Sequence, residues 1–174
     1  MRIISVVGHK NAGKTTLLVA LAREFHRRGK RVAAIKHTAQ AVEVDRPGTD
    51  SWRYFNEGLA GAVLVASPEL RIVFERQPDS LDAEQLASRH FADRDLVLVE
   101  GFETSDLPKI EIHRQAVGPH PLTASEGIPG KRVAIVTDCD VGHPGCPVLK
   151  FTDTMWLNLL VALAWDHAKV IEAA

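Results

Sequence analysis

Apolar residues along the chain fall into two kinds of segment, short continuous runs and longer stretches with helical spacing. The runs, typical of buried strands, cover residues 3–7, 31–36, 62–66, 71–74, 96–100, 109–113, 133–137 and, more weakly, 148–151. Helical spacing predicts helices over 14–28 and 82–91, a short helix through Trp52 and Phe55, and a last helix from Thr152 or Asp153 to the terminal alanine pair. Strands separated by helices predict an α/β fold, in which a mostly parallel sheet has helices on both faces.

Length and composition favour one ordinary globular domain. The chain has 174 residues, of which 45% are hydrophobic and 25% are charged; these values exclude a disordered, collagenous or fibrous chain. The sequence has no internal repeat and no low-complexity linker, so we expect a single domain over residues 1–174. The net charge is −1, which leaves no basic excess for a nucleic-acid partner.

Cysteine content and hydropathy bear on the cellular compartment. Cys139 and Cys146 are the only cysteines, too few for a disulfide framework and typical of a reducing environment. The first apolar run is too short for a signal peptide, and the apolar stretch at 155–165 is too short to span a bilayer. We therefore expect a cytoplasmic protein that does not bind membranes. His143 lies between the two cysteines at a spacing that could ligate zinc, but a fourth ligand is missing.

The most specific motif lies between the first predicted strand and the first predicted helix. It matches the phosphate-binding pattern G-x-x-x-x-G-K-S/T without a mismatch and consists of Gly8, His9, Lys10, Asn11, Ala12, Gly13, Lys14 and Thr15. The two glycines permit backbone conformations in which successive N–H groups point at phosphate oxygens, and the following helix N-terminus adds partial positive charge. The alternative is an ordinary glycine-rich turn. We interpret the segment as the phosphate loop of a P-loop NTPase.

Side chains at the end of this loop and of a later strand suit a bound nucleoside triphosphate. Lys14 would reach the β- and γ-phosphates as a catalytic cation, the Thr15 hydroxyl would ligate Mg²⁺, and Thr16 would contact the α-phosphate. Glu100 ends the apolar run at 96–100, in the Walker B position where a carboxylate orients the metal or its water. We expect Glu100 to serve the metal and catalysis; the alternative is an exposed acid at a strand end.

A further polar loop should reach the carboxyl edge of the sheet, where the ligands of α/β folds bind. This loop contains Asp45 and Asp50, and it follows the predicted strand that ends at Lys36. Asp50 is alternatively the N-cap of the short helix, and Pro47 with Gly48 alternatively forms a plain turn.

Together these motifs resemble the family of molybdopterin-guanine dinucleotide biosynthesis protein B, MobB. The resemblance covers about residues 2–140 and rests on the phosphate loop, the 35–38 strand end, the 45–51 loop, the 96–102 strand and the 108–111 segment. It implies a cytoplasmic, homodimeric P-loop protein that binds GTP and Mg²⁺, hydrolyses GTP weakly, and assists MobA, the enzyme that joins GMP to molybdopterin. It also implies that residues 8–16 bind phosphate, that Thr15 and Glu100 serve Mg²⁺, and that Asp45 and Asp50 lie near nucleotide or pterin.

Two features depart from the patterns expected of such a protein. His9 directly follows the first glycine of the loop. Relatives that dimerise around nucleotide often have a lysine at this position, so the sequence does not predict a lysine that reaches the nucleotide of a second subunit. The sequence also has no Asn-Lys-x-Asp motif for guanine. Asp140 follows a predicted strand and could accept the guanine N1–H and N2–H donors, with plain turn chemistry as the alternative.

The alternative function is that of a small-molecule P-loop kinase that uses Mg-ATP, because an acid such as Glu100 after a strand fits either class. A kinase needs basic residues that clamp the transferred phosphoryl group. Arg71, Arg76 and Arg94 are scattered and form no obvious basic lid, which favours the accessory GTP-binding protein.

Overall fold

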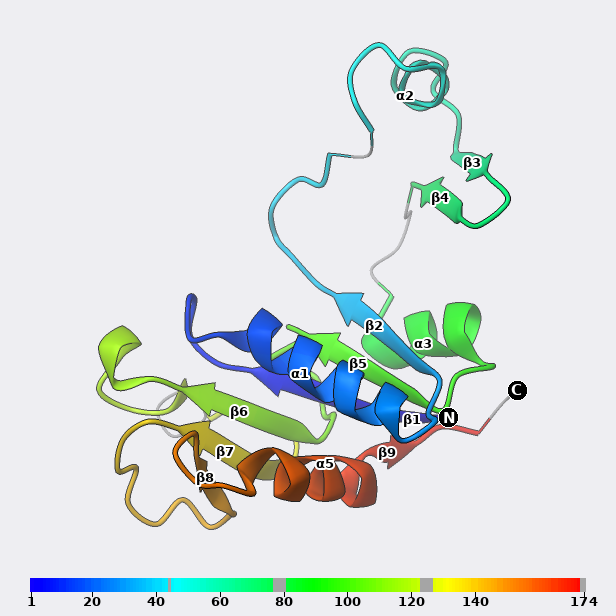
Figure 1. The fold of residues 1–174 in the computed structure, drawn as a ribbon. Helices are drawn as coiled ribbons and strands as arrows, with labels where there is room; N and C mark the ends of the chain where they lie inside the picture. Colours follow the sequence, from blue (N-terminus) through cyan, green and yellow to red (C-terminus); the bar gives the residue numbers. More distant parts are fainter. Residues whose placement is uncertain (44, 77–80, 123–126, 173–174) are drawn as a thin grey trace. The chain divides into compact units, whose positions relative to one another are not determined.

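The computed structural model describes residues 1–43, 45–76, 81–122 and 127–172, and Figure 1 shows its helices and strands. Contacts within the chain divide it into two compact units. One consists of Met1–His37 and Leu81–Ala174, and the other of Thr38–Ser80. We call them the sheet unit and the hairpin unit and describe each by itself. The assignment of residues 1–174 to a single domain stays a prediction.

A mostly parallel sheet forms the sheet unit, with the strand order β2-β5-β1-β6-β7-β8. Its parallel strands are β1 (Arg2–Val7), β2 (Val32–Lys36), β5 (Leu96–Glu100), β6 (Lys109–His113), β7 (Arg132–Thr137) and β8 (Val148–Lys150). Each corresponds to a predicted strand, and the α/β class is confirmed. The register places Val6 of β1 beside Glu100 of β5, and Val7 beside Glu111 of β6. The carboxyl ends of these three strands therefore meet at one edge of the sheet.

Helices cover both faces of this sheet, as the alternation of segments predicts (Figure 1). α1 (Lys14–Arg27) and α5 (Trp156–His167) pack on one face, and α3 (Ala83–Phe91) packs on the other. α3 begins with the predicted capping box, in which the side chains of Asp82 and Gln85 each accept a hydrogen bond from the other's backbone N–H. The predicted apolar face of α1 is buried and consists of Leu17, Leu18, Leu21 and Phe25.

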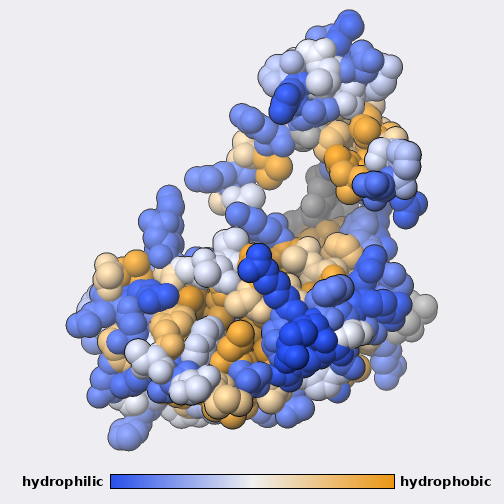
Figure 2. Space-filling view, in the orientation of Figure 1, coloured by the Kyte–Doolittle hydropathy of each residue, from blue (hydrophilic) through white to orange (hydrophobic). Residues whose placement is uncertain are grey.

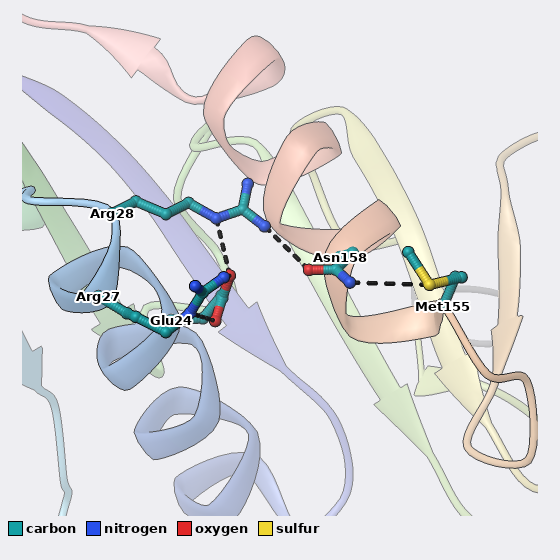
Figure 3. Close-up of polar contacts among 5 residues, drawn as sticks. All are labelled: Glu24, Arg27, Arg28, Met155 and Asn158. Carbon is teal, nitrogen blue, oxygen red and sulfur yellow. Dashed lines mark hydrogen bonds and ion pairs between the residues drawn. The ribbon is translucent and has the colours of Figure 1, made fainter.

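A polar network joins α1 to α5 at the surface (Figure 3). Glu24 accepts hydrogen bonds from Arg27 and Arg28, and these hold the pKa of its carboxyl at about 2, below the ordinary 4.5. Arg28 Nη2 also donates to Asn158 Oδ1 of α5 at 3.0 Å. Because such exposed ion pairs are screened by water, we expect the network to orient the two helices with little gain in stability.

The C-terminal helix is shorter than its sequence predicts. It begins at Trp156 rather than at Thr152 or Asp153 and ends at His167, where β9 (Lys169–Val170) follows and pairs antiparallel with the start of β1. The Ile171 N–H donates to the Met1 carbonyl, so pairing with β1 supplies the backbone partners that a longer helix would otherwise provide. Ala173 and Ala174, the predicted end of the helix, lie outside the described residues. Among the helices that the structure describes, none is long and apolar enough to cross a membrane.

The hairpin unit contains α2 (Asp50–Asn56), β3 (Ala62–Ala66) and β4 (Arg71–Glu75). The two strands are confirmed, but they pair antiparallel with each other in a separate sheet rather than joining the parallel one. α2 packs on this hairpin through Phe55, whose ring lies 6.3 Å from that of Phe74. Figure 2 shows apolar side chains gathered over the hairpin; those exposed are Leu64, Val65, Leu70, Ile72 and Val73.

Candidate functional site

The loop between β1 and α1 has the conformation that its glycines predict. Gly8 has a φ of +145°, and a Cβ at this position would lie 2.3 Å from the carbonyl oxygen of Ile112 on β6. Gly13 has a φ of +103° and forms the N-cap of α1. Any other residue at position 8 would therefore push the loop away from β6.

A cavity of about 640 Å³ opens over this loop. It is lined by Gly8, His9, Lys10, Asn11, Gly13, Lys14, Thr15, Thr16, Glu100, Glu103 and Leu122. Most residues predicted for phosphate and Mg²⁺ therefore meet at one place. Ala12 is the exception within the loop, because its side chain is buried in the core beneath it.

Lys14 and Thr15 contribute the polar groups at the base of the cavity. The Lys14 ammonium donates to the carbonyl oxygens of Gly8 at 2.7 Å and His9 at 3.0 Å, so it spans the loop from α1. The Thr15 hydroxyl donates to Glu100 Oε2 at 2.9 Å. The predicted catalytic cation and the two predicted metal residues thus lie together, and a hydroxyl with a carboxylate is an oxygen donor set that suits Mg²⁺.

Asp45 and Asp50 belong to the hairpin unit. The Asp45 carboxylate accepts hydrogen bonds from the Ser51 hydroxyl, the Arg46 N–H and the Thr49 hydroxyl, and these contacts hold its pKa below the ordinary value. Thr49, rather than Asp50, is the N-cap of α2, because its side chain accepts from the Trp52 N–H. Within its own unit Asp45 therefore closes a turn, and a contact of either aspartate with nucleotide or pterin stays a prediction.

The turn after β7 contains Asp140, the candidate guanine acceptor. Its Oδ1 accepts the Gly142 N–H at 2.9 Å, and it is not among the described residues that line the cavity. A role in base recognition stays a prediction. Cys139 and Cys146 in the same segment are free thiols, and the described part of the chain holds no group of three or more acidic, histidine or cysteine side chains placed for a metal ion.

Two lining residues, Glu103 and Leu122, are absent from the sequence-based site. Glu103 follows Glu100 closely enough that the Walker B position could have indicated it. Leu122 has no such signal, because it reaches the cavity from a segment that follows β6. His120 of the same segment contacts the phosphate loop, where its carbonyl oxygen lies 3.2 Å from His9 Nε2.

Comparisons with known proteins find similar sequences that share one family description. A family model described as molybdopterin guanine dinucleotide synthesis protein B, MobB, matches residues 3–138. The molybdopterin-guanine dinucleotide biosynthesis adapter protein of Haemophilus influenzae is 39% identical over 116 residues, which cover 65% of this chain and 64% of that protein. The protein of the same name from Escherichia coli is 37% identical over 122 residues, covering 68% and 69%. The chain thus spans less than two thirds of the Haemophilus protein.

Solved structures share the fold over nearly the whole chain. A MobB protein homolog from Bacillus stearothermophilus has a TM-score of 0.70 at 25% identity, and the match covers 94% of this chain and 98% of that chain. The Bacillus subtilis MobB structure has a TM-score of 0.71 at 21% identity, with the same coverage of 94% and 98%. These matches support the α/β architecture described above.

Proposed function

The chain belongs to the MobB family, and on this basis we propose that it is an adapter in the formation of molybdopterin guanine dinucleotide. In this role it binds GTP with Mg²⁺ and assists MobA, the enzyme that attaches GMP to molybdopterin. The curated relatives carry the name of such an adapter. Because the chain spans only part of their length, nucleotide, pterin and enzyme partners are all part of the proposal.

The observation that carries the nucleotide proposal is the meeting of Lys14, Thr15 and Glu100 in one cavity. The Lys14 ammonium already faces the loop, so a triphosphate would replace two carbonyl oxygens with β- and γ-phosphate oxygens. The Thr15 hydroxyl and the Glu100 carboxylate would hold Mg²⁺ directly or through water. When bound, this ion would supply positive charge that offsets the negative charge of the phosphates.

The kind of cation that lines this cavity is the basis for proposing slow hydrolysis. Its described lining includes Lys10 and Lys14 but no arginine. An arginine on the transferring phosphoryl group accelerates hydrolysis in P-loop proteins by roughly 10³–10⁵-fold. We therefore infer that the isolated chain turns GTP over weakly and acts mainly by binding.

A second copy of the chain is the proposed partner of the hairpin unit. Among the residues that the structure describes, β3 and β4 form a two-stranded sheet of their own, and an exposed strand edge favours strand pairing between molecules. Leu64 and Val73 are register partners, with 60% and 58% of their surface exposed. These features support a homodimer, and the two free cysteines support a cytoplasmic location.

Titration of the purified chain with GTP and ATP in the presence of Mg²⁺ tests the nucleotide proposal. We expect a preference for GTP and an affinity loss of about tenfold to hundredfold in Lys14→Ala, equivalent to a charge-assisted contact of roughly 1.5–3 kcal/mol. Lys131→Ala, which removes an exposed lysine outside the cavity lining, is the matched control. Unchanged GTP affinity in Lys14→Ala would overturn the phosphate-loop assignment. A preference for ATP with phosphate transfer to a metabolite would instead identify a kinase.

A further inference from the structure

Strand β6 buries three polar side chains on one face. Lys109, Glu111 and His113 are each 1% exposed or less, at alternate positions of the strand. The intervening Ile110 and Ile112 face the apolar core around α1 and α5. Burying a charge is costly unless it is paired and hydrogen-bonded, and apolar residues of similar volume are often at least as stable. The charged side chains of Lys109 and Glu111 therefore call for a role beyond packing.

Glu111 is bonded to a segment that walls the nucleotide cavity. Its Oε1 accepts the Leu122 N–H at 2.5 Å, and its Oε2 lies 3.9 Å from Nη1 of Arg132 on β7. Leu122 itself lines the cavity and is 5% exposed. Glu111 lies beside Val7 in the register, one residue before the phosphate loop. The buried Glu111 carboxylate thus links Leu122 by a hydrogen bond to β6, the strand beside the end of β1 from which the phosphate loop begins.

Lys109 is likewise hydrogen-bonded to a second segment that lines the cavity, the one that contains Glu103. Its ammonium donates to the carbonyl oxygens of Ser105, Leu107 and Pro129, the last at 2.6 Å. Ser105 closes a turn by donating through its N–H and its hydroxyl to the Phe102 carbonyl oxygen. Glu103 lies inside that turn and lines the cavity.

We propose that Glu111 and Lys109 are positioning residues for nucleotide binding. The two opposite charges lie two residues apart on one strand, and each fixes a segment that contributes a lining residue, Leu122 for Glu111 and Glu103 for Lys109. Neither residue lines the cavity, so both act through the segments they hold. This inference rests on the proposed binding of nucleotide at the phosphate loop. Displacement of a wall by about 1 Å is enough to weaken ligand positioning strongly.

The test compares variants of β6 in the purified full chain. Glu111→Met keeps the volume but removes the acceptor, and Lys109→Met removes the donor; each should weaken GTP binding in Mg²⁺ by about tenfold or more. Glu111→Gln keeps an acceptor oxygen for the Leu122 N–H and should weaken binding by only about threefold. Ile110→Val is the matched control, because it lowers stability from the opposite face and should leave GTP affinity unchanged.

A double-mutant cycle separates positioning from a general loss of stability. Leu122→Ala removes the wall itself, so its affinity loss should not add to that of Glu111→Met. Exchange of the Leu122 amide hydrogen without nucleotide should be faster in Glu111→Met than in the wild type. If Glu111→Met does not fold, Glu111→Gln with Leu122→Ala gives the same cycle. Additive losses of GTP affinity in Glu111→Met and Leu122→Ala would overturn the inference. A loss of GTP affinity in Ile110→Val that follows its melting temperature would overturn it as well. Equal GTP affinity of Glu111→Met and the wild type would overturn the positioning role but not the proposed function. Failure of the wild type to bind GTP would overturn both.

Discussion

The Thr15 hydroxyl donates a 2.9 Å hydrogen bond to Glu100 Oε2, which joins the first turn of α1 to the end of β5. The contact forms because β1 and β5 are neighbours in the sheet, with Val6 beside Glu100. The phosphate loop then returns the chain from β1 to α1 above the same edge. Two residues separated by 85 positions in the sequence are thereby brought together, and both are predicted to supply oxygen donors to Mg²⁺.

Replacing Glu100 with glutamine should separate the metal role from a structural one. Glu100→Gln keeps the shape and the acceptor for Thr15 but removes the negative charge that favours Mg²⁺. We expect Mg²⁺-dependent GTP hydrolysis to fall by roughly 10–100-fold, the usual effect of disturbing a metal's ligand environment. Binding of GDP without Mg²⁺ and the melting temperature should change little.

Glu103→Gln is the control for this variant, because Glu103 lines the same cavity and carries the same charge. It should reduce hydrolysis less than Glu100→Gln does. If metal-free GDP binding and the melting temperature both collapse in Glu100→Gln, then Glu100 is a structural residue and the metal assignment is wrong.

A substitution of Gly8 tests the backbone geometry of the phosphate loop. Gly8→Ala would place a Cβ 2.3 Å from the Ile112 carbonyl oxygen at a φ of +145°. We expect it to destabilise the chain by roughly 2–5 kcal/mol from strain and overlap together. Gly29→Ala is the control, because Gly29 has a φ of +74° but no atom within 4 Å of the added Cβ. It should cost only about 1–2 kcal/mol. Equal unfolding midpoints in urea for the two variants would contradict the close approach of β6 to the loop.

The sequence could predict those parts of the site that local patterns determine. Gly8, Gly13, Lys14 and Thr15 form one contiguous motif whose spacing already defines the turn into α1. Glu100 is predictable because the apolar run at 96–100 ends in an acid. The strands are likewise predictable from short apolar runs, which are a property of the local sequence.

What depends on distant segments could not be predicted in this way. Leu122 lines the cavity and donates its N–H to Glu111, which lies eleven residues earlier on β6, and no local pattern indicates that contact. The strand at Lys169–Val170 pairs with Arg2 and Ile3 of β1, which lie far away in the sequence, so local spacing predicts a helix that continues past His167. The pairing of β3 with β4 in a sheet of their own has no local signal either, because their apolar runs are similar to those of the parallel strands.

The exposed hairpin predicts the assembly state. Leu64 and Val73 face the same side of the hairpin as register partners, and both are largely exposed. We expect the wild type to sediment at micromolar concentration as a species of twice 19.1 kDa, and Leu64→Asp with Val73→Asp to sediment as the monomer. Glu57→Gln, an exposed change on the neighbouring helix end of the same unit, should leave the dimer intact. A wild type that sediments only as the monomer would contradict the homodimer.

Buried His113 links stability to pH. The side chain is 1% exposed, and both ring nitrogens lack a hydrogen-bond partner among the described residues. Burial lowers its pKa below 6.5 by disfavouring the charged ring; the positive forms of His9 and His120 lower it further, while Glu111 and Asp138 oppose the shift. Folding therefore favours neutral His113.

The resulting pH dependence has a definite sign. Between the lowered pKa of the folded chain and the ordinary pKa of the unfolded chain, the unfolded chain binds more protons, so stability rises with pH. The contribution of His113 is complete above about pH 6.5 and is lost as the pH falls toward the folded pKa. We expect the urea midpoint of the wild type to fall between about pH 7.5 and pH 5.5, and His113→Leu, which keeps a buried side chain without a titrating group, to reduce this fall. His26→Gln, at an exposed position on α1, should keep the wild-type slope. Identical slopes in wild type and His113→Leu would show that His113 does not carry the pH dependence.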